Sequence, residues 1–294
     1  MRSERRRDVA INYAVPTEYE FALYYGATNP VAAAPSNLSL TSRNINPEEL
    51  LSFIKRQSVE AIPESDGGAL ITDDKSDADP ITFFGQQYGD TDRSDDVFSS
   101  MATRVSQLAA ATQLMYLRYK LSDGSSNTFY RRYGAVKRFG SRMMRHTFYR
   151  GMESEMTFDV TDPWIYLDSQ SSDAVAVAGG TGAKVVTDSG SRKTKRVLLY
   201  VAKTGASSPA NVQIKNAANE TITLGGSLAT IGDFWEVDML RGRVSKSVSS
   251  VVSNDIANVT GRFWGIAAGT DTITVTDGGT ATFTVSALWL PRKV

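Results

Sequence analysis

The chain has 294 residues, 41% of them hydrophobic, and its 32 basic residues balance its 32 acidic residues. This composition excludes a disordered chain, and a net charge of zero provides no overall field that would attract nucleic acid or a membrane surface. The absence of cysteine excludes disulfides, thiolate metal sites and cysteine nucleophiles. No apolar run approaches the roughly 20 residues of a membrane span, and no signal-peptide core follows the basic start, so we expect synthesis in a cytoplasm without secretion.

The first 96 residues predict short elements and one acidic segment. Residues 21–25 are apolar and aromatic and predict a strand, while Asn46-Pro47 predicts the start of a helix over residues 48–56. Residues 60–96 contain eleven acidic and two basic residues, a net charge of −9. We expect this segment to be a long exposed loop or arm inserted in the N-terminal domain, with one possible strand at residues 81–84.

The clearest helical pattern of the chain begins after Ser94. One stripe at helical spacing contains Val97, Met101, Val105, Leu108, Thr112 and Met115. It predicts a long helix that ends near Leu121. Gly134 separates two aromatic and basic runs, at residues 129–133 and 135–139, and predicts a hairpin between them. A further strand is expected at residues 156–160.

The helical pattern disappears after Asp162-Pro163. Short alternating segments predict ten strands, at residues 164–167, 174–177, 184–187, 196–202, 211–215, 220–224, 234–238, 243–248, 272–276 and 281–289. Residues 216–219 and 277–279 predict hairpin links. This spacing indicates a β-sandwich or jelly roll. We therefore expect an α+β N-terminal domain, β-rich with one long helix, over residues 1–162, and an all-β domain over residues 163–294.

Several kinds of chemical site can be considered, and each has a simpler explanation. His146 is the single histidine and lies among arginines, without the glycine-flanked serine of a hydrolase. Glu153, Glu155 and Asp159 alternate on one strand face, as a glycosidase pair would, but arginines nearby favour salt bridges. The calcium-type cluster of Asp73, Asp74, Asp77 and Asp79 has Lys75 at the third position and lacks the glycine of an EF-hand loop. We therefore expect no catalytic, cofactor or metal site.

Residues 97–150 carry ten basic residues and one acid, a net charge of +9. Cations alternate with aromatic residues at 129–133 and 137–139, which is also the composition of a base-stacking surface, so nucleic-acid binding stays an alternative. The equal and opposite charges of this segment and of residues 60–96 favour contact within or between subunits. The predicted interface pairs one basic set with one acidic set: Arg131, Arg132, Lys137 and Arg138 with Asp73, Asp74, Asp77 and Asp79.

Carbohydrate binding is a further alternative for the β-rich half of the chain. Trp164, Trp235, Trp264 and Trp289 could stack on sugar rings. Most of them fall inside predicted strands with apolar neighbours, so packing in the core is the favoured role.

A family resemblance rests on turn and strand residues of this half. They are Asn211, Ile214, Asn219, Ile222, Leu224, Gly232, Asp233, Val237, Asp238, Gly242, Val244, Phe263, Trp264, Gly269 and Ile273. Their order resembles the C-terminal domain of distal tail proteins of long-tailed (siphovirus-type) bacteriophages. The preceding helix pattern, arginine-rich stretch and Phe158-Asp-Val-x-Asp-Pro163 sequence are similar as well, so the likeness covers residues 97–294.

The resemblance implies a structural virion protein without enzymatic activity. Such a protein forms a ring, typically a homohexamer, in the baseplate hub between the tail tube and the tail-tip or receptor-binding apparatus, and DNA passes through its lumen. The N-terminal domain would form the ring, and the C-terminal domain would be a galectin-like sandwich. A carbohydrate-binding β-sandwich or an adhesin-type tail protein is the alternative function.

Overall fold

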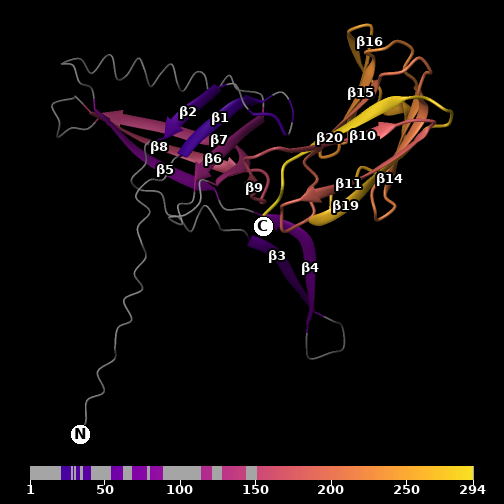
Figure 1. The fold of residues 1–294 in the computed structure, drawn as a ribbon. Helices are drawn as coiled ribbons and strands as arrows, with labels where there is room; N and C mark the ends of the chain where they lie inside the picture. The colour runs from indigo at the N-terminus through magenta and orange to yellow at the C-terminus, as the bar shows by residue number, and fades with distance from the viewer. Residues whose placement is uncertain are drawn as a thin grey trace, which may run out of the picture.

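The computed structural model describes residues 21–27, 29, 31–33, 36–40, 54–61, 68–77, 80–88, 114–120, 128–143 and 151–293. Within these ranges the protein is built almost wholly of antiparallel strands. They form one seven-stranded sheet, a sandwich of a six-stranded and a five-stranded sheet, and a separate two-stranded hairpin (Figure 1). The one helix in the described part of the chain is a short 3₁₀ turn, η2 (Ile256–Asn258).

The seven-stranded sheet, called the N-terminal sheet below, has the order β2-β1-β6-β7-β8-β5, with β9 beside β7. Its strands are β1 (Phe21–Ala27), β2 (Ser36–Leu40), β5 (Ile81–Tyr88), β6 (Leu114–Lys120), β7 (Phe129–Met143), β8 (Gly151–Val160) and β9 (Tyr166–Leu167). The strands expected near residues 21–25, 81–84 and 156–160 are confirmed as parts of β1, β5 and β8. β5 lies inside the segment that was expected to be mainly a loop. This part is a strand because it pairs with β8 along its whole length.

β7 is one continuous strand, so the hairpin predicted around Gly134 is wrong. The first half of β7 pairs with β6, and the second half pairs with β8. A Cβ atom at Gly134 would lie 2.3 Å from the carbonyl oxygen of Asp159 and 2.6 Å from the ring of Phe158. The glycine is therefore needed for close packing against β8 and does not mark a turn.

The predicted helices are also corrected. Residues 114–120, at the end of the expected long helix, form β6, which pairs with β1 and β7; the rest of that helix lies outside the described residues. Residues 54–56, at the end of the expected helix at 48–56, belong to β3 (Ile54–Ala61). An α+β N-terminal region with one long helix is not seen in the part of the chain that the structure describes.

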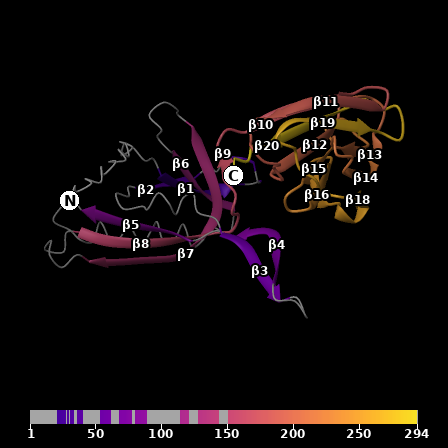
Figure 2. The same ribbon diagram turned by 90° about the horizontal axis from the view of Figure 1, so that it is seen from below.

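β3 and β4 (Gly68–Asp77) form a hairpin that pairs with no other described strand. Figures 1 and 2 both show it projecting away from the sheets. The acidic segment expected to be a loop or arm thus contains part of a β-hairpin arm.

The β-sandwich expected for the second half of the chain is confirmed. The six-stranded sheet has the order β10-β20-β12-β15-β16-β17, and the five-stranded sheet has the order β11-β19-β13-β14-β18. Their strands are β10 (Ser171–Val177), β11 (Thr181–Asp188), β12 (Val197–Lys203), β13 (Ala210–Lys215), β14 (Thr221–Ser227), β15 (Phe234–Asp238), β16 (Arg243–Val248), β17 (Val251–Asn254), β18 (Val259–Gly261), β19 (Gly269–Thr276) and β20 (Phe283–Trp289).

The ten strands predicted after residue 163 all overlap observed strands, and β17 and β18 were not predicted. The predicted hairpin link at residues 216–219 joins β13 to β14 and is confirmed. The link predicted at 277–279 is not a hairpin, because it carries the chain from β19 in one sheet to β20 in the other.

The sandwich core is apolar and includes three tryptophans. Trp235, Trp264 and Trp289 are at most 2% exposed, which confirms that they pack in the core. Each indole N–H has an acceptor: a carboxylate oxygen of Asp255 at 2.8 Å, the carbonyl of Ile214 at 3.3 Å and a carboxylate oxygen of Asp188 at 3.1 Å. A buried N–H without an acceptor is costly. The need to pair two indole N–H groups therefore explains why Asp255 and Asp188 are buried.

The residues that carried the family resemblance have two structural roles. The apolar ones, such as Ile214, Trp264 and Ile273, are fully buried between the two sheets. The Asn and Gly residues have positive φ angles of 52–96° at Asn211, Asn219, Gly232, Gly242 and Gly269. Left-handed backbone favours these residue types. The sequence signature therefore records the core and the turns of this sandwich.

Candidate assembly site at the junction of the sheets

A backbone ladder joins the N-terminal sheet to the sandwich. β9 pairs with β7, and the segment after β20 pairs with β9 in turn, through Leu167 N–H to the Pro291 carbonyl and Lys293 N–H to the Ile165 carbonyl, both at 2.8 Å. Arg292 then faces Arg192 across an isolated bridge. The end of the sandwich chain is thus hydrogen-bonded to the edge of β9, which fixes the two regions to each other at this junction.

Arg131 is held entirely within the chain. Its side chain is 5% exposed, and its Nε forms an ion pair with the Asp168 carboxylate, which Arg118 also contacts at 2.6 Å. The remaining nitrogens donate to the carbonyls of Asp168 at 2.9 Å and Ala32 at 3.0 Å. The guanidinium lies 4.6 Å above the ring of Tyr116. This predicted interface arginine therefore stabilises the subunit itself.

Arg196 forms the second ion pair of the junction. It is 3% exposed and donates from Nη2 to a carboxylate oxygen of Asp162 at 2.7 Å, which also accepts from the Tyr166 hydroxyl at 3.0 Å. The guanidinium lies 3.3 Å from the centre of the Tyr133 ring. Burial alone would lower the pKa of Arg196, but Tyr133 and Asp162 raise it overall. Asp162, which follows β8, is thereby bonded to Tyr166 of β9 and to Arg196, the residue before β12.

The other predicted interface residues are distributed differently. Arg132 is fully buried and Lys137 is exposed. The side chains of Arg138, Asp73, Asp74 and Asp77 lie outside what the structure describes, as does all of Asp79. The pairing of this basic set with the acidic set therefore stays a prediction, with Lys137 as its exposed described cation.

The alternation of cations and aromatic residues is explained by contacts inside the chain. Tyr24 stacks on Tyr116 with ring centres 5.3 Å apart, and Arg118 lies 3.7 Å from the centre of the Phe129 ring. Arg131 and Arg196 make cation–π contacts with the rings of Tyr116 and Tyr133, respectively. Tyr24, Tyr116, Phe129 and Tyr133 thus already take part in intramolecular stacking or cation–π contacts, which makes them less available to a nucleic-acid base.

A cleft of about 760 Å³ opens where the two regions meet. Five cations line it against one acid: Lys193, Lys195, Arg196, Arg241 and Arg292 against Asp162. Trp164, Tyr133 and Tyr166 provide aromatic wall. The cleft has the size of a ligand site and a strongly positive lining.

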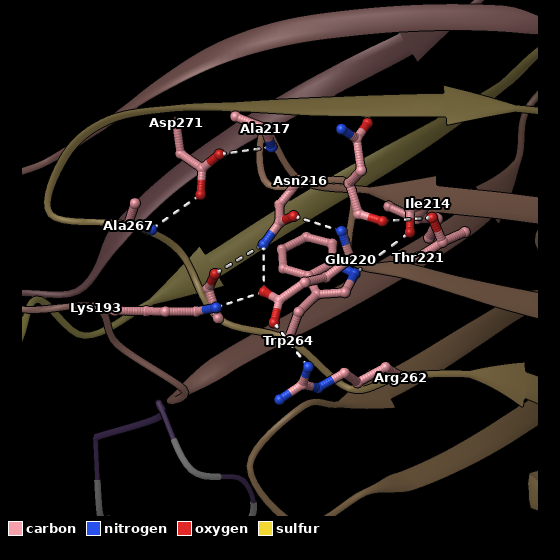
Figure 3. A network of polar contacts seen from close by, with 12 residues as sticks. Lys193, Ile214, Asn216, Ala217, Glu220, Thr221, Arg262, Trp264, Ala267 and Asp271 are labelled. Carbon is pink, nitrogen blue, oxygen red and sulfur yellow. Dashed lines mark hydrogen bonds and ion pairs between the residues drawn. The ribbon is translucent and has the colours of Figure 1, made fainter. Parts of the chain in front are cut away.

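A polar network on the sandwich side fixes one of these cations (Figure 3). The Lys193 ammonium is bonded to the Glu220 carboxylate, which also accepts from the Asn216 amide at 2.8 Å. These two hydrogen bonds, the one from Lys193 first, lower the pKa of Glu220 below its ordinary value. Arg262 lies 3.7 Å from the second carboxylate oxygen. Glu220 therefore stays ionised and holds the turn between β13 and β14.

Asp271 ties two turns of the same region together. Its two carboxylate oxygens accept from Ala217 N–H at 3.0 Å and Ala267 N–H at 2.9 Å, as Figure 3 shows. A carboxylate can accept at both oxygens, whereas an asparagine has one acceptor oxygen. The aspartate thus holds the β13–β14 turn against the segment that leads into β19.

Most of the residues considered for catalysis and metal binding have side chains outside the described part of the structure. Within the described ranges, no group of three or more His, Asp or Glu residues is arranged to hold a metal ion. His146 and the side chain of Glu153 lie outside those ranges, and Glu155 and Asp159 are half-buried on β8. No helix of the described part has the length and hydropathy to cross a membrane.

One exposed feature was missed by sequence reasoning. β17 is an edge strand whose Val251 and Val252 are 69% and 65% exposed, and Ile231 in a neighbouring turn is 64% exposed. No described strand pairs with its outer edge. The Val-Val pair beside Ser249-Ser250 was the available signal, because Ser249 and Ser250 form the turn that leads into β17.

Comparison with solved structures finds phage tail proteins. The SPP1 Dit (gp 19.1) protein, described as a paradigm of hub adsorption apparatus in Gram-positive-infecting phages, has a TM-score of 0.57 and 11% identity, over 93% of this chain and 99% of that chain. A chain of the phage P2 baseplate, in its activated conformation with Ca, has a TM-score of 0.55 and 10% identity, over 92% of this chain and 98% of that chain. The same baseplate with Sr gives 0.54 and 10%, with equal coverage.

No protein-family model and no curated protein matches the sequence. The structural likeness nevertheless spans both the N-terminal sheet and the sandwich, since it covers more than nine-tenths of the chain. The resemblance to distal tail proteins that we inferred from turn and core residues is therefore confirmed at the level of the fold, and this chain has the fold of the phage Dit and baseplate hub proteins.

Proposed function

We propose that this chain is a structural protein of a phage virion, a distal tail or baseplate hub protein that joins the tail tube to the tail-tip or receptor-binding apparatus. The observation that carries the proposal is the extent of the fold likeness to the SPP1 Dit protein, 93% of this chain and 99% of that one. A shared sandwich alone would say little about function, because such folds serve many roles. Here the whole two-part architecture is shared.

The composition of the junction supports this role. Arg131, Arg196 and Tyr166 are hydrogen-bonded inside the chain. Among the described residues, no group of His, Asp and Glu is arranged to hold a metal ion. A hub protein needs a rigid connection between the part that forms the ring and the part that faces outward. The buried ion pairs and the backbone ladder between β9 and the end of the chain provide such a connection.

The finer organisation is part of the same proposal. Residues 1–162 form the ring, typically a hexamer, and contact the tail tube, while residues 163–294 form an outward-facing galectin-like domain. Docking of tail-tip or receptor-binding proteins would use the outward domain, where β17 offers an exposed apolar edge. No enzymatic activity is proposed.

Electron microscopy of the purified chain tests the proposal. We expect ring-shaped particles with a central lumen, whose mass by native mass spectrometry is a fixed multiple of the 32.0 kDa chain. Mixing with purified tail tubes should place these rings at one tube end. A chain that remains monomeric both alone and with tail tubes would contradict the proposal.

A further inference from the structure

The cations of the junction cleft are not all neutralised inside the chain. Arg196 is paired with Asp162, and Lys193 is paired with Glu220. Arg241 forms only a long ion pair with Asp238, at 3.8 Å, and its side chain is 35% exposed. Lys195 is exposed and has no acidic partner among the described residues. The cleft therefore keeps an excess of positive charge at its rim.

The fold also brings like charges together at this place. Arg192 and Arg292 are directly opposite across a backbone bridge, an arrangement that destabilises a β ladder. Burial is the main cause that lowers the pKa of Arg292; Tyr166 and Asp162 act to raise it, and the charge of Arg192 adds to the lowering. Residues 192–196 alone contain four cations in five positions. An anionic ligand in the cleft would offset this repulsion.

The shape and the walls of the cleft indicate a polypeptide ligand. Its volume of about 760 Å³ holds several side chains. Trp164, Leu240 and Met115 give it apolar and aromatic wall beside the cations. A small inorganic anion would use the cations and leave this wall exposed to water, whereas a peptide that carries both carboxylates and apolar side chains would use both.

The chain itself contains a segment of that composition. β4 reads Gly-Ala-Leu-Ile-Thr-Asp-Asp-Lys-Ser-Asp, with three acids against one lysine and an apolar half. Its hairpin with β3 pairs with no other described strand and projects from the sheets. We propose that the junction cleft is a binding site for an acidic peptide strand, and that its occupant is the β4 strand of a neighbouring copy in the ring. This inference rests on the proposed ring.

Binding of a synthetic peptide to the full chain tests the site, at a dilution at which the rings have dissociated, so that no neighbouring β4 strand already fills the cleft. The probe is the sequence of residues 68–79, and the readouts are calorimetry and tryptophan fluorescence, because Trp164 lies at the cleft and the other three tryptophans are buried. We expect saturable one-to-one binding that weakens with salt. The double variant Lys195→Gln/Arg241→Gln should bind at least tenfold more weakly, and Lys215→Gln, an exposed lysine on β13, should bind like the wild type.

Two further arms identify the ligand chemistry. A peptide with asparagine at each aspartate should lose the binding, and inorganic phosphate at matched charge should bind at least tenfold more weakly than the acidic peptide. Equal binding of phosphate and peptide would overturn the peptide site. Equal binding of the peptide to wild type and double variant would overturn the assignment to this cleft.

The assembled protein tests the occupant separately from the function. We expect Lys195→Glu/Arg241→Glu to shift the ring to monomers in light scattering, and Asp73→Lys/Asp74→Lys in the same chain to restore rings. Rings that persist unchanged in the glutamate variant would overturn the occupant and leave the hub function standing. Absence of rings in the wild type would contradict the hub function, whatever the peptide result.

Discussion

The sandwich and the junction are stabilised in opposite ways. Between the sandwich sheets, two dozen buried apolar residues pack together, and the buried Asp255 and Asp188 accept hydrogen bonds from tryptophan indoles. At the junction, charged and aromatic side chains alternate, with Arg131 on Tyr116 and Arg196 on Tyr133. Apolar packing tolerates many equivalent arrangements, while hydrogen-bonded ion pairs require one geometry. The sandwich therefore supplies stability, and the junction supplies a defined orientation.

The largest effect is expected inside the sandwich. Replacing Trp235 with alanine removes a fully buried ring and leaves Asp255 without its indole donor, which should lower the free energy of unfolding by roughly 3–5 kcal/mol. Chemical denaturation followed by circular dichroism measures it. Trp164→Ala, at the half-buried cleft residue, is the matched control and should cost much less. Equal losses at the two positions would contradict the contrast between core and junction.

A substitution at the junction should cost less free energy of unfolding than one in the sandwich core, but it should loosen the backbone ladder between the two regions. Arg196→Met keeps the bulk of the side chain and leaves Asp162 without its ion-pair partner, at a cost of about 1.5–3 kcal/mol. We expect faster amide hydrogen exchange at Leu167 and Lys293, whose N–H groups form the ladder, while exchange in the sandwich core is unchanged. Arg262→Met, whose side chain is 76% exposed, should leave both measurements at wild-type values. Uniform acceleration across the core would argue against a separate role for the junction.

A smaller, stabilising change is expected in the turn before β17. Ser249 and Ser250 have φ angles of 49° and 69°, the left-handed pair that a two-residue hairpin turn requires. Replacing them with Asn-Gly should raise the free energy of unfolding by about 1 kcal/mol, because left-handed backbone is costly for serine. Thermal denaturation measures the gain. Ser253→Gly, within β17, should instead destabilise slightly, and stabilisation there would contradict the backbone explanation.

The smallest effect concerns pH. Lys193 and Asn216 lower the pKa of Glu220 from its ordinary value of 4.5, so the stabilisation is present above pH 4.5 and is lost as pH falls through the lowered value. In the Glu220→Gln variant the free energy of unfolding should therefore fall less steeply below pH 4.5 than in the wild type. Burial raises the pKa of Asp188, so its charged form opposes folding and protonation relieves this. Asp188→Asn removes this relief, so the free energy of unfolding should fall more steeply below pH 4.5 than in the wild type. A shallower fall in both variants, or a steeper fall in both, would contradict both assignments.

Prediction from sequence succeeded where the pattern is local. The turns at Asn219, Gly232 and Gly242 demand left-handed backbone, and the segments between them alternate between core and solvent. Ten strands and the fold likeness were predictable for that reason. The link at residues 277–279 has the same turn composition as a hairpin, and nothing local indicates that it crosses between sheets.

The failures arose where distant partners decide the structure. Residues 114–120 fit a helical stripe, but pairing with β1 and β7 on both sides makes them a strand. Arg131 was expected at a subunit interface because residues 97–150 and 60–96 carry opposite charges. Within the chain it pairs instead with Asp168, 37 residues away. The cleft was not predicted from the sequence, since Lys195 and Arg241 were not selected, and the pairing of the basic set with the acidic set stays a prediction.

Immunogold labelling of phage particles that contain this chain tests the central claim most directly. We expect label at the distal end of the tail, where the tube meets the tip, with none on the capsid. Label distributed along the tail or on the capsid would contradict it.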